Sequence, residues 1–487
     1  MSTAVAPDSL PQPLPAVQTG AQTPRPWLAE VMDDTVGRTG ARLGLAWIFV
    51  VAFFAVFAPF LANSHPYLLK ADDPDLARRF GTWSSPLLRF LSGADVTLVI
   101  LAVAATILWF NRRLGTGQKL LLFFAVLFAA LPITYWQPFF QWVAGKRREW
   151  DTFPSTTKEA LRITVACLMW AIDLALLAWI LIASGIPRRA RVTCAIALAA
   201  VAILLIIFPV NPPVLARYEA YRQAQAAGHV QFVLRAPLPY SASDRLRDAF
   251  DPDRPHPWPP AAGHWLGTER NGADILSRMM HACRIAMAIG FIATGIAAVI
   301  GAIVGGLMGY FVGWVDLVGM RVVEIFGSIP IMYLLLAFVA FFERNMYMIM
   351  VIIGLTTWVG DARFVRAEFL RLRNQDFVHA ARAAGLPLWS VLFRHMLPNA
   401  MAPLLVSASF GIASAILFEA TLSYLGLGLI DDPSWGQLLN QALSEGGLFY
   451  WWLAVFPGLA IFLTVFAFNL IGEAVRDALD PKLKGVQ

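Results

Sequence analysis

Long apolar runs without charge constrain this chain more than any other feature. The first, over residues 43–62, contains no charged side chain. About 20 such residues, rising 1.5 Å each, cross the roughly 30 Å hydrocarbon core of a bilayer. With 58% hydrophobic and only 14% charged residues, the chain is too apolar for a soluble protein of 487 residues. We therefore expect an all-α polytopic membrane protein.

Nine further apolar runs are candidate membrane spans. Their lengths vary, and the shortest are expected to extend at their ends. Together with the first run they predict about ten transmembrane helices. Four precede the polar stretch that begins at Asn211, and five follow it: 96–110, 120–139, 160–184, 192–210, 285–310, 322–342, 347–358, 402–422 and 451–471.

The charges indicate orientation in a membrane rather than binding to nucleic acid. The net charge is +6, but the basic residues form short clusters between apolar runs. We expect residues 1–42, rich in Pro, Ala, Ser and Thr, to be a disordered cytoplasmic tail. Ten spans place both termini inside, with Arg112 and Arg188 cytoplasmic, as the positive-inside rule requires. Lys146 then falls outside, against that rule.

The segment 361–399 does not look like an ordinary connector. It is rich in arginine, which predicts a cytoplasmic location, and its apolar residues recur at near-helical spacing. Gly385 is expected to turn the chain at positive φ between two helices, and Pro398 to end the second one. On periodicity alone, a surface that binds another protein and a helix lying on the lipid are equally consistent with this pattern.

Two motifs in this segment favour the first interpretation. Residues 379–385 (HAARAAG) are followed at the matching distance by residues 395–399 (HMLPN). This pair resembles the EAA loop of ABC importer permeases, although His379 stands where the family pattern has Glu. The resemblance implies that the loop couples the chain to an ATPase subunit through His379, Ala380, Ala381, Gly385, Leu397 and Pro398.

Further motifs narrow the resemblance to the C-type permease subunit of dipeptide and oligopeptide importers. They cover the first span and about residues 264–484, and a weaker likeness at residues 66–70 (PYLLK) points to importers of microcin C type peptides. The motifs are residues 264–278 (HWLGTERNGADILSR), 422–428 (LSYLGLG), 433–436 (PSWG) and 472–481 (GEAVRDALDP).

The resemblance implies a type I ABC importer permease fold of six core helices. The first core helix is residues 43–62, and the permease core domain is residues 284–484. Between them we expect an insertion at 63–210 with four transmembrane helices, and an extracytoplasmic loop region at 211–283. Because an even number of inserted spans preserves the orientation of the core, we expect the core to assemble without the insertion.

The same resemblance implies partners in a bacterial inner membrane. These are a second permease subunit forming a heterodimer, two ATP-binding cassette ATPase subunits and an extracytoplasmic solute-binding protein. The chain has no GxxxxGK[ST], LSGGQ, HExxH or GxSxG motif, and its three cysteines lie far apart. We therefore expect no cofactor, no metal and no enzymatic activity of its own.

Alternatives remain at this stage. One is a stand-alone secondary transporter, another a membrane-embedded enzyme, and a third an ABC permease for a solute such as a metal chelate or sugar. Glu419 lies within an apolar run and is a candidate for lining the translocation pathway, against a structural role. The stripe of Gly301, Gly305, Gly306 and Gly309 indicates close helix packing.

Overall fold

The computed structural model describes residues 27–71, 83–110, 119, 122–123, 126, 218–246, 256–342, 344–429, 432–443 and 447–479. The expected spans at 160–184 and 192–210, nearly all of 120–139, and Arg112, Lys146 and Arg188 lie outside the described residues.

The first expected span is a helix, and it begins earlier than predicted. α2 runs over Thr39–Leu61, and a second helix, α1, precedes it at Trp27–Gly37. Residues 27–37 and 39–42 are therefore helical rather than part of a disordered tail. α1 is held because Val31 and Thr35 are buried, and because the next residue, Arg38, pairs with Asp477 at 2.5 Å.

Four helices in the described part of the chain are long and apolar enough to cross a membrane, or up to six if each of two bent pairs is one span. The long helices besides α2 are α10 (Ile275–Phe311), α16 (Leu397–Tyr424), which continues the π-helix η2 (Ser390–Met396), and α18 (Trp451–Leu479). The upper value, with each bent pair counted as one span, equals the six core helices expected. The all-α polytopic class is confirmed.

The two bent pairs overlap the expected spans 322–342 and 347–358. α11 (Gly313–Ser328) and α12 (Ile331–Phe341) meet at 85°. Pro330 forces Ile329 into an extended conformation, so the helix cannot continue through this point. α13 (Met346–Thr357) and α14 (Val359–Leu372) meet at 45°.

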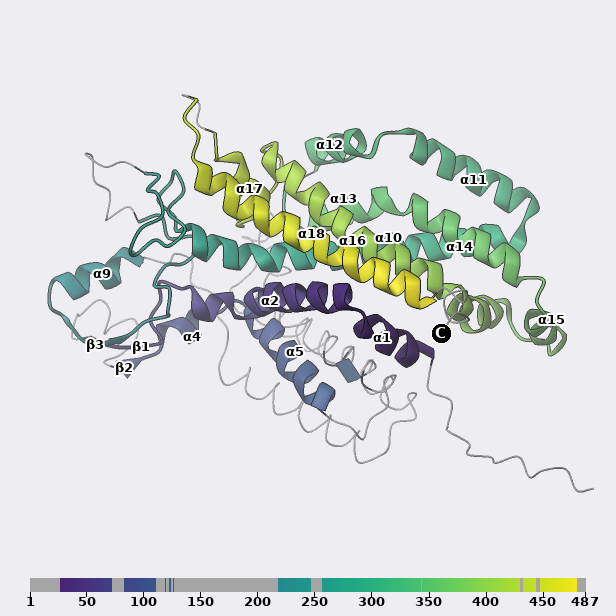
Figure 1. The fold of residues 1–487 in the computed structure, drawn as a ribbon, viewed down its shortest axis with the longest axis horizontal. Coiled ribbons are helices and arrows are strands. Elements are labelled where there is room, and N and C mark those ends of the chain that lie inside the picture. The colour runs from purple at the N-terminus through teal and green to yellow at the C-terminus, as the bar shows by residue number, and fades with distance from the viewer. Residues whose placement is uncertain are drawn as a thin grey trace, which may run out of the picture.

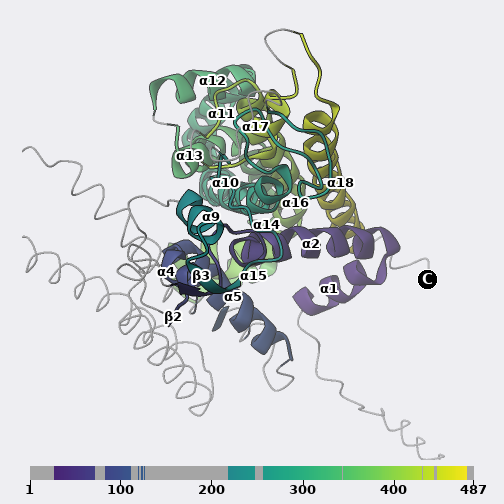
Figure 2. The ribbon, with the colours of Figure 1, turned by 90° about the vertical axis from the view of Figure 1, so that its left-hand side faces the viewer.

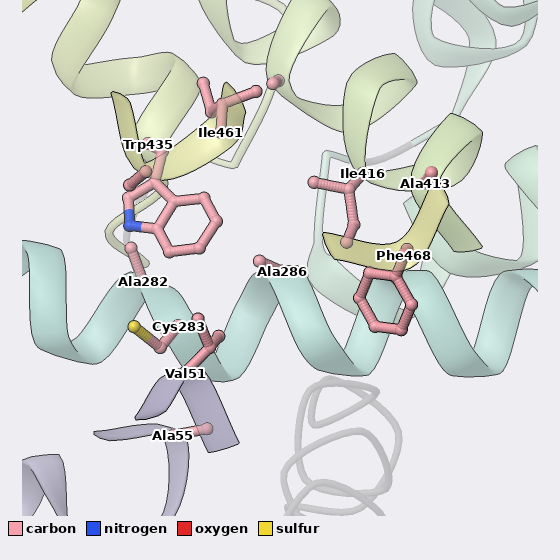
Figure 3. Close-up of a cluster of buried hydrophobic side chains, with 12 residues drawn as sticks. Val51, Ala55, Ala282, Cys283, Ala286, Ala413, Ile416, Trp435, Ile461 and Phe468 are labelled. Carbon is pink, nitrogen blue, oxygen red and sulfur yellow. The ribbon is translucent and has the colours of Figure 1, made fainter. Parts of the chain in front are cut away.

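α10 lies at the centre of the helical part, against α2, α13, α14 and α16 (Figure 1). It begins at Ile275, inside the expected loop region, because Asp274 caps it by accepting a hydrogen bond from the Ser277 amide at 2.9 Å. Figure 3 shows Ala282, Cys283 and Ala286 of α10 between α2 on one side and side chains of α16, α17 (Trp435–Asn440) and α18 on the other.

The glycine stripe of α10 lets α14 pack closely against it. A Cβ at Gly301 or Gly305 would overlap atoms of residues 361 and 362, and one at Gly309 would lie 2.6 Å from the Arg366 carbonyl oxygen. The structural interpretation of this stripe is confirmed. Residues 361–372, the first part of the expected loop 361–399, are therefore a helix packed against α10.

A small sheet lies outside the helical part, which the sequence did not predict. Its order is β2-β1-β3, with β1 (Leu68–Ala71) paired antiparallel to both β2 (Trp83–Ser84) and β3 (Val230–Leu234). α9 (Tyr218–Ala226) covers one face of this sheet. After β2, the short α4 (Pro86–Phe90) leads into α5 (Gly93–Phe110), which corresponds to the expected span 96–110.

Candidate functional site

The segment that carries the HAARAAG motif forms a helical bracket. α15 (Asp376–Ala383) follows α14 after a short turn, and η2 follows α15 after a second turn. Gly385 occupies that second turn at φ +72°, which confirms the predicted positive φ. The Gly385 amide donates to the Arg382 carbonyl at 3.0 Å and the Leu386 amide to the Ala381 carbonyl at 3.2 Å. This is the Schellman pattern that ends a helix.

One face of α15 is buried in its own chain. Val378 is fully buried and Ala381 is 7% exposed. They pack in one cluster with residues of α14 and η2, notably Phe369 and Met396. Ala381 therefore packs inside the bracket and does not form part of an outer contact surface. The motif alone had suggested that it contacts the ATPase subunit.

The opposite face of α15 is open, and we call it the α15 surface. It consists of His379, Ala380, Ala383 and Ala384, all exposed. Because three of these four side chains are methyl groups, another backbone can approach closely. Exposed apolar side chains border this surface, with Trp389 the most exposed at 71%: Phe377, Leu386, Leu388 and Trp389.

The bracket is fastened to the membrane helices by polar contacts. The guanidinium of Arg382 lies over the Tyr310 ring of α10 at 5.5 Å from its centroid. Arg366 of α14 makes a two-point contact with the carboxylate of Asp316 on α11, with one N–O distance of 2.7 Å. These contacts join α15 to α10 and α14 to α11.

Leu397 and Pro398 do not end a helix, which corrects the prediction made for Pro398. η2 continues into α16 as one helix over 390–424. Proline inside an α-helix removes a hydrogen bond and clashes with the carbonyl four residues earlier. Here Pro398 stands in the first turn of α16, directly after seven residues of wider π-helix. The changed hydrogen-bond pattern accommodates the ring.

Glu419 lies inside the protein. It is 3% exposed, and the Ser423 hydroxyl donates to its carboxylate at 2.6 Å. The neighbouring Ala420 packs against Gly436 of α17, so this part of α16 is covered. These surroundings suit a structural role, and pathway lining by Glu419 stays a prediction.

The second motif, residues 264–278, forms a buried network of paired polar side chains around the start of α10. We call this network the polar knot. Asp274 pairs with His264 at 2.8 Å, and Glu269 pairs with Arg278 at 3.1 Å. Both carboxylates are fully buried. Gln441, which follows α17, donates to Glu269 at 2.7 Å. The sequence showed these residues as a motif but gave no sign that they pair with one another.

A pair of charges that sequence reasoning missed joins the inserted segment to the core. Arg284 of α10 lies 2.6 Å from Asp95 of α5, and both side chains are largely buried. The same guanidinium donates to the Ala55 carbonyl of α2 at 3.2 Å. Among the described residues, no group of three His, Cys, Asp or Glu side chains could hold a metal ion.

The sequence of this chain is similar to those of known transport proteins. The model of the family "Binding-protein-dependent transport system inner membrane component" matches residues 285–485. The glutathione transport system permease protein GsiD of Pectobacterium atrosepticum is 40% identical over 248 residues, covering 51% of this chain and 80% of its own. The oligopeptide transport system permease protein OppC of Escherichia coli K12 is 39% identical over 256 residues, covering 52% and 82%.

A solved chain of the MetNI methionine ABC transporter in an inward-facing form also aligns. It covers 42% of this chain and 97% of its own at 19% identity, with a TM-score of 0.35. GsiD and OppC, which share more sequence with this chain, match about half of its length. The motifs had predicted a resemblance of this extent.

Proposed function

This chain belongs to the family of binding-protein-dependent transport system inner membrane components, and from that membership we propose that it is the permease subunit of an ATP-driven peptide importer. It is a multi-pass inner-membrane protein, and the ATP hydrolysis that drives transport takes place on a partner subunit. The proposal of a peptide substrate is supported by the names of the relatives, which transport glutathione and oligopeptides.

The proposal that this permease is coupled to an ATPase rests on the α15 surface. It is exposed, lined by small side chains and bordered by apolar ones, and the rest of its helix is packed on α14 and η2. A rigid surface of this kind suits an ATPase that pulls on the bracket during its cycle. The importer would contain a second permease as a heterodimer partner, two ATPases and an extracytoplasmic solute-binding protein, with both termini of this chain cytoplasmic.

Coupling requires that the ATPases bind one permease conformation better than the other. The bracket contacts α10 through Arg382 and α11 through Arg366 of the adjoining α14. Movement of the α15 surface would thus reach the helices at the centre of the fold. A stand-alone secondary transporter has no ATPase partner that such a surface would bind.

The test replaces one methyl group of this surface by a long charged side chain. In Ala383→Arg we expect ATPase subunits to associate at least about tenfold more weakly with the purified permease, a loss of roughly 1.4 kcal/mol. The matched control is Ala226→Arg, an exposed alanine at the end of α9, for which association should be unchanged. Normal ATPase association and substrate-stimulated hydrolysis in Ala383→Arg would contradict the coupling role of the α15 surface.

A further inference from the structure

The small sheet beside α2 has two faces of opposite character. On one face, Leu69 and Val233 pack against Tyr221 and Ala224 of α9, and α9 exposes Gln223 and Gln225 on its other side. On the other face, cross-strand neighbours expose large apolar side chains. These are Leu68, Trp83, Phe232 and Leu234, each between 41% and 59% exposed. We call them the outward face of the sheet.

The register places these side chains together. Leu68 is paired with Leu234, and Lys70 is paired with both Trp83 and Phe232. Because side chains alternate between the faces of a strand, all five project from the same face. The Lys70 ammonium lies 5.5 Å from the centroid of the Trp83 ring, so its charge sits over this apolar face.

The sheet is fixed to the end of a membrane helix. The Leu238 amide donates to the carbonyl of Leu61, the last residue of α2, at 2.9 Å, and the Tyr67 hydroxyl donates to the Phe60 carbonyl. The Tyr67 amide in turn donates to the Leu234 carbonyl at 2.8 Å. Residues 62–67, between α2 and β1, are held by these hydrogen bonds, so the sheet stays close to the end of α2.

The chain also leads from this sheet into the apolar helix α5, which corresponds to the expected span 96–110. β2 is followed by α4 and then by α5, whose apolar residues begin at Ala94. Figures 1 and 2 show the strands beside α4, with α9 on the side away from α5. The polar helix and the apolar face of the sheet thus point in different directions, as required of an element at a boundary between water and lipid.

We propose that the outward face of the sheet lies in the interfacial layer of the outer leaflet, in contact with phospholipid. The order of side chains along the strands suits this position. The aliphatic Leu68 and Leu234 lie nearest α2, and the Trp83 ring with the Lys70 ammonium lies farther along β1. Tryptophan is enriched at headgroup level, where its amphipathic ring is favoured. A lysine beside it can lay its aliphatic stem along the apolar layer and keep its ammonium among the polar headgroups. This inference does not depend on what the protein transports.

The experiment measures the depth of spin labels in a membrane. Nitroxides are attached at Phe232→Cys and Leu234→Cys, and at Ala226→Cys on α9 as a matched control, in a full-length chain whose three native cysteines are replaced by alanine. Each variant is reconstituted in nanodiscs of phosphatidylethanolamine and phosphatidylglycerol. Collision rates with oxygen, which concentrates in lipid, and with a water-soluble nickel chelate are then compared.

The ratio of oxygen to nickel collisions should be several-fold higher at residues 232 and 234 than at residue 226. A ratio equal to that of the control would place the outward face in water and overturn the proposal. Protection from both reagents would show that protein covers the face, in this chain or a partner, and would overturn it equally. Should one variant fail to fold, Leu68→Cys reports on the same face from β1.

Discussion

At the scale of single residues, Gly385 and Arg284 are constrained in different ways. Gly385 has no atom within 4 Å of the place where a Cβ would stand, so only its φ of +72° matters. Arg284 is constrained by charge, because it is a largely buried cation whose partner Asp95 comes from another helix. The first constraint is local and was readable from the sequence, whereas the second depends on residues brought together by the fold.

For Gly385, we predict that conformation rather than size decides the effect of a substitution. Gly385→Val should cost about 1–2 kcal/mol in this turn, because a Cβ-branched residue disfavours positive φ. The altered turn should weaken ATPase association about tenfold and abolish substrate-stimulated hydrolysis, while the protein still inserts. Gly385→Asn should keep most of the coupling, because asparagine tolerates this conformation. Equal stimulation in the valine and asparagine variants would show that the turn does not matter.

For Arg284, we predict that Asp95→Asn destabilises the protein by about 3 kcal/mol, because an unpaired buried charge remains. Thermal unfolding in nanodiscs measures this change. The double variant Asp95→Asn with Arg284→Gln should be more stable than Asp95→Asn alone. Arg321→Gln is the control, since it breaks an exposed pair with Glu324 and should have little effect. No difference between Asp95→Asn and this control would show that the pair is not structural.

At the scale of elements, the sequence predicted what local signals encode and missed what distant segments build. The span at 43–62 and the turn at Gly385 have local causes, and both were expected. The apolar residues of segment 361–399 recur at near-helical spacing, yet Phe369 is buried and Phe364 is exposed, because the position of α10 decides which side of α14 is covered. The sheet was missed because β1 and β2 are very short and β3 lies far along the chain.

The contacts of the inserted segment with the core also join distant parts of the chain, so the sequence did not reveal them. They refine the expectation that the core assembles without the insertion. Lys70 and Phe232 are neighbours across the sheet, so joining residue 70 to residue 231 requires little movement. The deletion nevertheless removes Asp95 and leaves Arg284 unpaired. We predict that the shortened chain is poorly stable alone, and that adding Arg284→Leu restores a monodisperse protein that binds its ATPase. If Arg284→Leu gives no improvement, the insertion contributes more to the core than this one ion pair.

At the scale of the whole molecule, the functional features separate along the axis of the long helices. α15 lies toward one end of the described helices, and the small sheet lies toward the other (Figure 1), where α10 begins after Asp274 of the polar knot. α10 connects the two, since its first turns hold Arg278 of the knot and its last turns hold Tyr310 beneath Arg382. A permease needs this arrangement, because ATP is used on one side of the membrane and substrate arrives on the other.

From this separation we predict a topology that can be tested in intact cells. In a cysteine-free chain, Ala226→Cys should react with an impermeant maleimide from outside, whereas Ala383→Cys should react only after the membrane is permeabilised. Both residues are exposed alanines on helices, so their intrinsic accessibility is comparable. Ten spans further require that Arg112→Cys and Arg188→Cys behave like residue 383, and Lys146→Cys like residue 226. Because each crossing reverses the side of the chain, external labelling at residue 112 or 188 would remove the four-span insertion, and external labelling at residue 383 would invert the proposed orientation altogether.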